Sequence, residues 1–398
     1  MLIRGEGREA MNETVRLTMA SGVDETAACG RLTIDLAALV ENYRRLCRRA
    51  TPTPVAAVVK ADAYGLGAAE VVPVLHSAGC RDFFVAHFIE AVRLKPFLPG
   101  DARLYVLNGL MPGSEGACAD LGAIPVLNSL DQAKAWSALA LARGIELAAA
   151  LQVDTGMARL GLSLPELQAL AADPAGLAGI RLTLLMSHLA CADQPDHAAS
   201  PSQLAGMRTA STLFPGIPVS FANSGGVFLG PEYRGDLARP GVALYGAAPT
   251  VAEENPMHPV VRLDVRVIQT RTVPAGTAVG YGGAYVTPRE TRIATLAAGY
   301  ADGLPRSLSN RGAAWFEGTR LPIIGRISMD SLMVDVTALA EDALAPGTLV
   351  EMIGPNQTLE AVAADADTIS YEILTRLGQR YHRHYAYPSS REGGQGQS

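Results

Sequence analysis

The chain has 398 residues and a formal net charge of −6 at pH 7, and 48% of its residues are hydrophobic. A chain of this length exceeds the size at which one hydrophobic core stops growing, so we expect two domains. The mild charge and the absence of a basic cluster exclude a nucleic-acid or membrane-surface partner, and no apolar run reaches the roughly 20 residues that span a bilayer. We therefore expect a soluble, cytoplasmic protein.

The two ends of the chain predict no folded structure. Residues 1–29 mix charges and lack the apolar core of a signal peptide, which favours a disordered leader, and residues 387–398 resemble a flexible tail. The five cysteines are scattered and include no CxxC pair. This spacing argues against a disulfide scaffold and against a zinc site, so we expect no metal.

The first elements in chain order are a short strand and a helix. The stretch LTIDLAALVENYRRLCRR begins at Leu32 and places apolar side chains on one face of a helix. Those side chains are Leu36, Leu39, Val40, Tyr43 and Leu46.

Eight apolar, strand-like runs alternate with helical patterns. They cover residues 55–59, 83–87, 103–108, 124–128, 146–154, 180–188, 219–223 and 236–246. Strands that alternate with helices imply right-handed crossovers and a parallel sheet. We therefore predict an α/β fold, a (β/α)8 TIM-type barrel over residues 30–250, with an open doubly wound sheet as the alternative.

The pattern changes after residue 250. Alternating strands and turn signals, as in RLDVRVIQTRTV and GTLVEMIG, continue without regular helices. This pattern predicts a second, mainly β domain over residues 251–386. Residues 247–259, which include three prolines, form a plausible joint between the two domains.

Lys60 stands at the end of the first predicted barrel strand, in the sequence VAAVVKADAYGLG. An ammonium beside a strand core is unfavourable unless it is neutral, paired or covalently bound. The simple alternative is that Lys60 reaches solvent at the strand end. However, only three of the 33 basic residues are lysines, so a positive charge alone is usually supplied by arginine. Lysine forms Schiff bases and arginine does not, which makes Lys60 a candidate for carbonyl binding.

Other chemical groups fall at the carboxyl ends of the later strands, where barrel enzymes place their working residues. Arg159 follows the fifth strand and His188 ends the sixth, while Asn223 and Ser224 lead into a glycine pair after the seventh. Glycine and serine in the loops after strands seven and eight favour phosphate binding. A lysine together with a phosphate loop predicts a phosphorylated aldehyde, of which pyridoxal phosphate is the common one.

The motifs that carry this chemistry resemble those of the alanine racemase family. They are AVVKADAYGLG, VDTGMARLG, MSHLACAD, ANSGG, ARPGVALYG, VGYGGAY, AAGYADGLPR and GRISMDS. The resemblance runs in order from about residue 30 to Tyr385.

The resemblance implies that Lys60 holds pyridoxal 5'-phosphate as an aldimine and acts as one base, with Tyr281 as the other. Racemisation needs two groups on opposite faces of the α-carbon, and this pair supplies them. Arg239 is expected at the pyridine nitrogen, where it donates a hydrogen bond rather than a proton. His188 would bridge Arg239 and Tyr281, and Arg159 would bind the cofactor phenolate and the substrate carboxylate.

The resemblance also implies the binding residues and a homodimer with shared active sites. The cofactor would be held by Tyr64, Asn223, Ser224, Arg239, Gly241, Val242 and Tyr371. The substrate alanine would meet Arg159, Met329, Asp330 and Tyr300. Each barrel would face the β domain of the partner, which supplies Tyr281, Met329 and Asp330. The enzyme would make D-alanine, a peptidoglycan precursor, or consume it; the sequence leaves both directions open.

The chain departs from the family pattern at Gln152. Many members carry a carbamylated lysine there, whose negative charge positions the arginine that corresponds to Arg159. An amide accepts a hydrogen bond but supplies no charge, so we expect substrate affinity rather than catalysis to change.

Each site residue also has a structural reading when it is taken singly. His188 resembles a core histidine, Arg239 a salt-bridge partner and the tyrosines core or rim aromatics. At the level of function, the alternatives are a racemase of broader specificity, for example for serine, and a non-catalytic pyridoxal phosphate carrier. Carriers lack the β domain, and a decarboxylase would place an acid where Arg239 stands.

Overall fold

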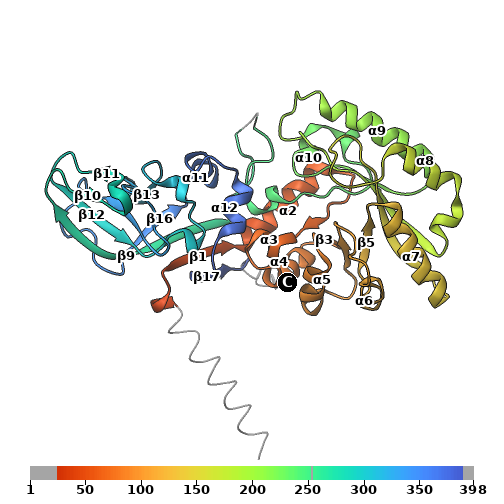
Figure 1. Cartoon of the computed structure of the whole chain (residues 1–398), viewed down its shortest axis with the longest axis horizontal. Coiled ribbons are helices and arrows are strands. Elements are labelled where there is room, and N and C mark those ends of the chain that lie inside the picture. Colours follow the sequence, from red (N-terminus) through yellow and green to blue (C-terminus); the bar gives the residue numbers. More distant parts are fainter. Residues whose placement is uncertain (1–24, 252–253, 389–398) are drawn as a thin grey trace, which may run out of the picture. The chain divides into compact units, whose positions relative to one another are not determined.

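The computed structural model describes residues 25–251 and 254–388. The chain forms two compact units (Figure 1). Of the described residues, one unit contains 25–35 together with Val261–Ala386, and the other contains Leu36–Val260 and residues 387–388. Most of the predicted leader and tail lies outside the described residues. Within the described ranges, none of the helices combines the length and apolar character that a bilayer crossing requires.

The unit Leu36–Val260 is built on a parallel sheet whose strands follow one another in sequence order. Its strands are β2 (Ala57–Val58), β3 (Asp82–Val85), β4 (Arg103–Val106), β5 (Ile124–Leu127), β6 (Leu147–Gln152), β7 (Ile180–Met186) and β8 (Val219–Ser220). All residues of β3 and β5 are buried, as expected for strands that are covered on both faces.

The eighth position of the barrel is filled by an irregular segment, residues 236–240. The amide of Ala238 donates to the Pro54 carbonyl at 2.9 Å, and the amide of Ala56 donates to the Ala238 carbonyl at 2.8 Å. On the other side, the amide of Arg239 donates to the Ala222 carbonyl at 2.8 Å. These bonds close the predicted barrel. The predicted strand 236–246 is nevertheless too long, because Pro240 has no N–H to donate and the chain turns into the 3-10 helix η4 (Val242–Tyr245).

Helices connect the strands and cover the outside of the sheet; α7, α8 and α9 line the outer side of this unit in Figure 1. The helices are α2 (Leu36–Ala50), α3 (Lys60–Tyr64), α4 (Ala68–Ser77), α5 (Phe88–Leu94), α6 (Glu115–Leu121), α7 (Leu130–Arg143), α8 (Leu164–Ala172), α9 (Ala199–Leu213) and α10 (Gly226–Leu229). Short 3-10 turns are η1 (Lys95–Phe97), η2 (Pro174–Leu177) and η3 (Pro231–Tyr233). The predicted apolar face of α2, from Leu36 to Leu46, is buried and confirmed.

The other unit is mainly β, as predicted. Its longest strand, β9 (Val261–Val273), pairs with β1, β12 and β16. The remaining elements are β10 (Ala278–Val279), η5 (Tyr281–Gly283), β11 (Tyr285–Val286), β12 (Thr291–Leu296), η6 (Tyr300–Asp302), η7 (Arg306–Leu308), β13 (Ala313–Phe316), β14 (Thr319–Pro322), β15 (Leu332–Asp335), β16 (Leu349–Ile353), α11 (Leu359–Asp365), α12 (Ser370–Arg376) and β17 (His382–Ala386).

Strand β1 (Gly30–Asp35) lies in the β unit rather than in the barrel, where the sequence pattern placed residues 30–35. It pairs antiparallel with β9 and parallel with β17, and Figure 1 shows the three strands together. Alternate residues of β1 are buried, which is the pattern of a strand with one covered face. The barrel strands lack this alternation. The structure therefore divides the chain at Asp35 and Val260 rather than at residues 30 and 250.

Candidate active site

Lys60 follows β2 and opens a left-handed turn. The four residues from Ala61 to Tyr64 all have φ between 52° and 56°. A left-handed conformation costs an L-residue roughly 1–2 kcal/mol, so the turn depends on bonds from its surroundings. Within the turn, the amide of Gly65 donates to the Ala61 carbonyl at 2.7 Å, and the amide of Ala63 donates to the Val59 carbonyl at 2.9 Å. The strain thus lies in the four residues that directly follow Lys60, the candidate nucleophile.

The Lys60 amine is half-buried at the carboxyl end of the first barrel strand. Burial lowers the pKa of Lys60, the positive charge of Arg159 lowers it further, and the carboxylate of Glu90 opposes both effects. A lower pKa leaves a larger share of the amine neutral at working pH. A neutral amine is the form that attacks a carbonyl and the form that accepts a proton.

His188 and Arg239 follow β7 and β8 and interact electrostatically. Burial and the charges of Arg239, Arg159 and Lys60 lower the pKa of His188 to about 3. The imidazole is therefore neutral at physiological pH. Because charge interactions link all four groups, the structure brings the four predicted residues of this unit, Lys60, Arg159, His188 and Arg239, into one cluster.

Arg239 is held rigidly. Its guanidinium donates to the Ser187 carbonyl at 2.6 Å and to the Ser220 hydroxyl, and it lies 5.9 Å from the centre of the Phe84 ring. Burial lowers the pKa of Arg239 to about 9, so the group stays protonated at neutral pH. The surface salt-bridge reading of Arg239 is wrong, because only 3% of the residue is exposed.

The loops after β8 and around residue 241 form a tight cradle. The buried Ser224 hydroxyl accepts from the amides of Gly241 at 2.9 Å and Ala243 at 3.3 Å. A Cβ on Gly241 would stand 2.2 Å from the Tyr64 hydroxyl, so Tyr64 and Gly241 are in direct contact. Val242 begins η4 beside them. Four of the predicted phosphate-binding residues are thus neighbours.

Asn223 has a local role in the same region. Its side-chain oxygen accepts from the Gly226 amide at 3.0 Å, and its side-chain nitrogen donates to the Leu189 carbonyl at 3.1 Å. The residue therefore fixes the start of α10 relative to the segment that follows β7.

Arg159 lies on an exposed loop that is tied at its base. The Asp154 carboxylate accepts from the amides of Gly156, Met157 and Ala158, at 2.9, 2.9 and 3.1 Å. Burial works to raise the pKa of Asp154, but these three donors outweigh it and the net shift is downward. Asp154 therefore holds a turn.

Gln152 is buried at the end of β6, and its amide nitrogen donates to the Leu160 carbonyl at 3.2 Å. The bond anchors the loop one residue from Arg159. Gln152 therefore acts on the backbone beside the arginine.

The predicted residues of the β unit are exposed, and the backbone at Tyr300 bonds to the loop that carries Met329. Tyr281, Tyr300, Met329 and Tyr371 are 71%, 44%, 53% and 44% exposed. The amide of Tyr300 donates to the Ser328 carbonyl, and the amide of Ala301 donates to the Met329 carbonyl. The reading of these tyrosines as core aromatics is thus wrong for this unit taken by itself.

Asp330 belongs to a charged network of the β unit. Arg380 donates to Asp330 at 2.7 Å and, through two nitrogens, to the fully buried Asp302 at 2.6 and 2.7 Å. The network fixes the loop that carries Met329 against η6, which begins at Tyr300.

Two polar residues near the cluster were not predicted from the sequence. Gln203 of α9 is 1% exposed; it donates to the His188 carbonyl at 2.9 Å and accepts from the Ala190 amide at 2.9 Å. Glu90 of α5 accepts from the Ala61 amide at 2.6 Å. The sequence signals only a helical glutamine and a helix-capping glutamate, so neither contact was foreseeable.

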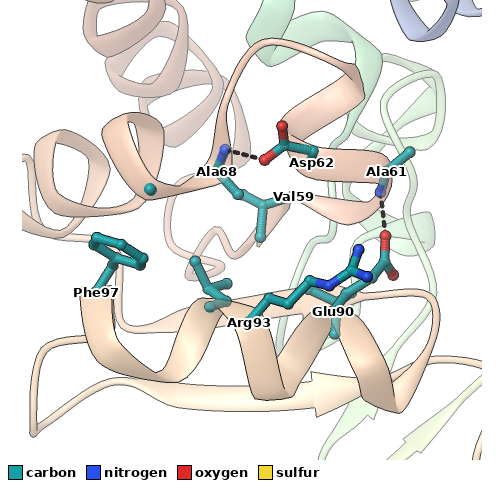
Figure 2. A pocket seen from close by; sticks show the side chains of 10 residues that line it. Val59, Ala61, Asp62, Ala68, Glu90, Arg93 and Phe97 are labelled. Carbon is teal, nitrogen blue, oxygen red and sulfur yellow. Dashed lines mark hydrogen bonds between the residues drawn. The ribbon is translucent and has the colours of Figure 1, made fainter. Parts of the chain in front are cut away.

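A pocket of about 470 Å³ lies between α4 and α5 (Figure 2). It is lined by Ala61, Asp62, Glu90, Arg93 and Phe97, among others, and Lys60 is not part of its lining. The pocket therefore adjoins the left-handed turn at Ala61 and Asp62.

The fold and this cluster define an enzyme of the class that joins a (β/α)8 barrel to a separate β domain. Residues 34–249 match the family model "Alanine racemase, N-terminal domain", and residues 260–385 match "Alanine racemase, C-terminal domain". The chain belongs to the alanine racemase family and is an isomerase that acts on amino acids. This confirms the resemblance found in the sequence.

Individual relatives agree with the family match. A protein of Agrobacterium fabrum named "Alanine racemase, catabolic" is 61% identical over 91% of this chain and 93% of its own length. A second catabolic alanine racemase, from Rhizobium johnstonii, is 58% identical over 94% of this chain and 98% of its own length. The crystal structure of alanine racemase from Bartonella henselae, with covalently bound pyridoxal phosphate, has a TM-score of 0.87 and 45% identity, and covers 90% of this chain and 99% of that one.

Proposed function

We propose that this chain interconverts L-alanine and D-alanine, with pyridoxal 5'-phosphate bound covalently to Lys60. The observation that carries the proposal is the half-buried Lys60 amine, whose pKa is lowered, in one electrostatic cluster with Arg159, His188 and Arg239. The pyridoxal phosphate in the Bartonella henselae relative supports the cofactor.

The residues of the barrel fit this cofactor. The Ser224 hydroxyl and the amides of Gly241 and Ala243 converge in one place, and a methyl group on Gly241 would collide with Tyr64. Because those amides donate to the Ser224 oxygen, they fix the hydroxyl in place and leave its own O–H to donate to a phosphate. Tyr64, Asn223, Ser224, Gly241, Val242 and, from the β unit, Tyr371 are the residues proposed to hold it.

When bound, the cofactor withdraws electrons from the α-carbon of alanine and so makes its proton removable. Lys60 takes or returns the proton on one face of that carbon. Tyr281 of a partner subunit does the same on the other face, since a single base cannot reach both.

Arg239 supports this chemistry at the pyridine nitrogen. It is buried and remains protonated, so it donates a hydrogen bond without giving up a proton. The ring therefore withdraws electrons less strongly than a protonated pyridine. His188, neutral at physiological pH, would accept or donate a hydrogen bond between Arg239 and Tyr281.

Arg159 and the backbone at Met329 would bind the substrate carboxylate, and Tyr300 and Tyr371 would narrow the entry so that alanine is favoured over larger amino acids. Asp330 would fix the Met329 loop through its bond with Arg380.

A homodimer would complete each site. The exposure of Tyr281, Tyr300, Met329 and Tyr371 supports it, because large side chains exposed together mark an interaction surface. Sedimentation of the purified protein would test the dimer, and a strictly monomeric, active enzyme would contradict it.

The predicted role in making D-alanine for peptidoglycan in the cytoplasm remains a proposal. The two relatives named catabolic support a second role, the breakdown of alanine. A D-alanine requirement after deletion of the gene would favour the biosynthetic role, whereas loss of growth on alanine alone would favour the catabolic one.

A chiral assay of the purified enzyme against a panel of amino acids tests the proposal. Alanine should racemise fastest, and Lys60→Ala should lose both the absorbance band of the lysine-bound cofactor and the activity. Fast racemisation of serine would favour the broader racemase, and a cofactor band without any racemisation would favour the carrier.

A further inference from the structure

Glu90 is the third residue of α5, and its two carboxylate oxygens accept hydrogen bonds from two different backbone segments. One oxygen, Oε2, accepts from the amides of Ala86 and His87 at 2.7 and 2.9 Å. These bonds are an ordinary capping arrangement, in which a carboxylate in the first turn satisfies backbone donors that the helix leaves free.

The second oxygen of Glu90 bonds to a residue outside α5. Oε1 accepts from the amide of Ala61 at 2.6 Å, a short and charge-assisted bond that Figure 2 shows as a dashed line. Ala61 directly follows Lys60. The bond therefore ties the end of β3 and the start of α5 to the residue beside the nucleophile.

The turn that receives this bond is unfavourable by itself. Ala61, Asp62, Ala63 and Tyr64 all have positive φ, a conformation that L-residues adopt only when the surroundings impose it. At its far end, the Asp62 carboxylate accepts from the Ala68 amide at 2.7 Å (Figure 2). At its near end, the Glu90 carboxylate is the side chain that accepts from the turn.

Glu166 of α8 provides the comparison. It occupies the same helix position, and its Oε2 accepts from the Ser163 amide at 2.8 Å and from the Ser163 hydroxyl at 2.7 Å. Both bonds stay within its own helix cap. Capping α5 therefore does not explain why Glu90 also reaches Ala61.

We propose that Glu90 is a positioning residue for Lys60: its carboxylate holds the left-handed turn at Ala61, and so directs the lysine amine toward the barrel mouth. The inference rests on the proposed function, because it concerns the same lysine.

The electrostatics of the cluster support this role. Arg159, on the loop after β6, His188, which follows β7, and Glu90 all interact electrostatically with Lys60. Burial and the charge of Arg159 lower the pKa of Lys60, whereas the charge of Glu90 raises it. Loss of the Glu90 charge should therefore lower the pKa of Lys60 further.

The test uses the cofactor-free protein and the variants Glu90→Gln, Glu90→Asp and Glu166→Gln. Amines are labelled competitively across a range of pH and quantified by mass spectrometry, with Lys95 and Lys134 as internal references. We expect the pH at which Lys60 is half labelled to fall in Glu90→Gln and to stay unchanged in Glu166→Gln. If the pH at which Lys60 is half labelled is the same in Glu90→Gln as in Glu166→Gln, the proposal is overturned.

A second readout separates geometry from charge. Glu90→Asp keeps the charge but is one methylene too short to hold Ala61 and both cap amides. It should capture added pyridoxal phosphate about tenfold more slowly, while Glu166→Gln remains like the wild type. If Glu90→Asp captures pyridoxal phosphate at the wild-type rate, Glu90 does not position Lys60 through its geometry. Failure of the wild-type protein to bind the cofactor would instead contradict the proposed function, since the labelling comparison does not require the cofactor.

Discussion

The hydroxyl of Tyr64 stands where a side chain on Gly241 would have to lie, since a Cβ at Gly241 would be 2.2 Å from that oxygen. The contact joins the turn that carries Lys60 to the loop after the eighth barrel segment. A residue larger than glycine at position 241 must displace Tyr64 or the cradle around Ser224.

We expect Gly241→Ala to weaken pyridoxal phosphate binding by about tenfold or more, since overpacking in a rigid site typically costs about 1–3 kcal/mol. An absorbance titration of the cofactor-free protein measures this. Tyr64→Phe removes the nearest clashing atom, so Gly241→Ala should cost less affinity in the Tyr64→Phe background than in the wild type. Unchanged binding in Gly241→Ala would show that the cofactor does not use this cradle.

Tyr281→Phe should reduce proton removal from one alanine enantiomer by about 100-fold or more and leave the other far less affected, because the phenol would serve one face of the α-carbon. Incorporation of deuterium from heavy water, started separately from L-alanine and D-alanine, measures both directions. Tyr285→Phe is the control, because Tyr285 packs against the core cluster of Val279, Ile293 and Ile324. Equal, mild effects on both enantiomers would rule out the two-base mechanism.

His188 should make the cofactor-free protein sensitive to acid. Folding lowers its pKa from 6.5 to about 3, so as the pH falls through this range the unfolded chain binds a proton that the folded chain does not. Stability from this source is present above pH 6.5 and is lost toward pH 3. In His188→Gln the stability curve should be flatter by up to ~1.4 kcal/mol per pH unit within the window. Urea unfolding at fixed protein concentration measures the slopes, and parallel curves would contradict a depressed pKa.

Gln152→Leu should raise the KM for alanine by about tenfold and change kcat much less. The substitution leaves the Leu160 carbonyl without its donor, which loosens the loop that carries Arg159. Steady-state kinetics in both directions give the two constants. A fall in kcat at constant KM would place Gln152 in the chemical step and contradict a role in substrate affinity.

Local patterns were sufficient for the architecture of the barrel. Strands such as β3 and β5 are buried on both faces, and therefore appear in the sequence as short continuous apolar runs between helices. Local patterns predicted β1 as a strand but assigned it to the barrel instead of the β unit. Its partners begin at Val261 and His382, and a pairing over such distances leaves no mark on the six residues of the strand.

The candidate active site also combines features that the sequence predicts with features that only the structure shows. The sequence alone pointed to Lys60, because a lysine at a strand end is costly and this chain uses arginine almost everywhere else. The tertiary structure alone decided how Lys60 is held. The bond from Glu90 to Ala61 spans 29 positions, and the bond from Gln203 to His188 begins on a separate helix. A glutamate in the first turn and a glutamine within a helix are compatible with any helix, so these residues do not indicate a distant partner. Only the packing of distant elements determines which backbone groups they reach.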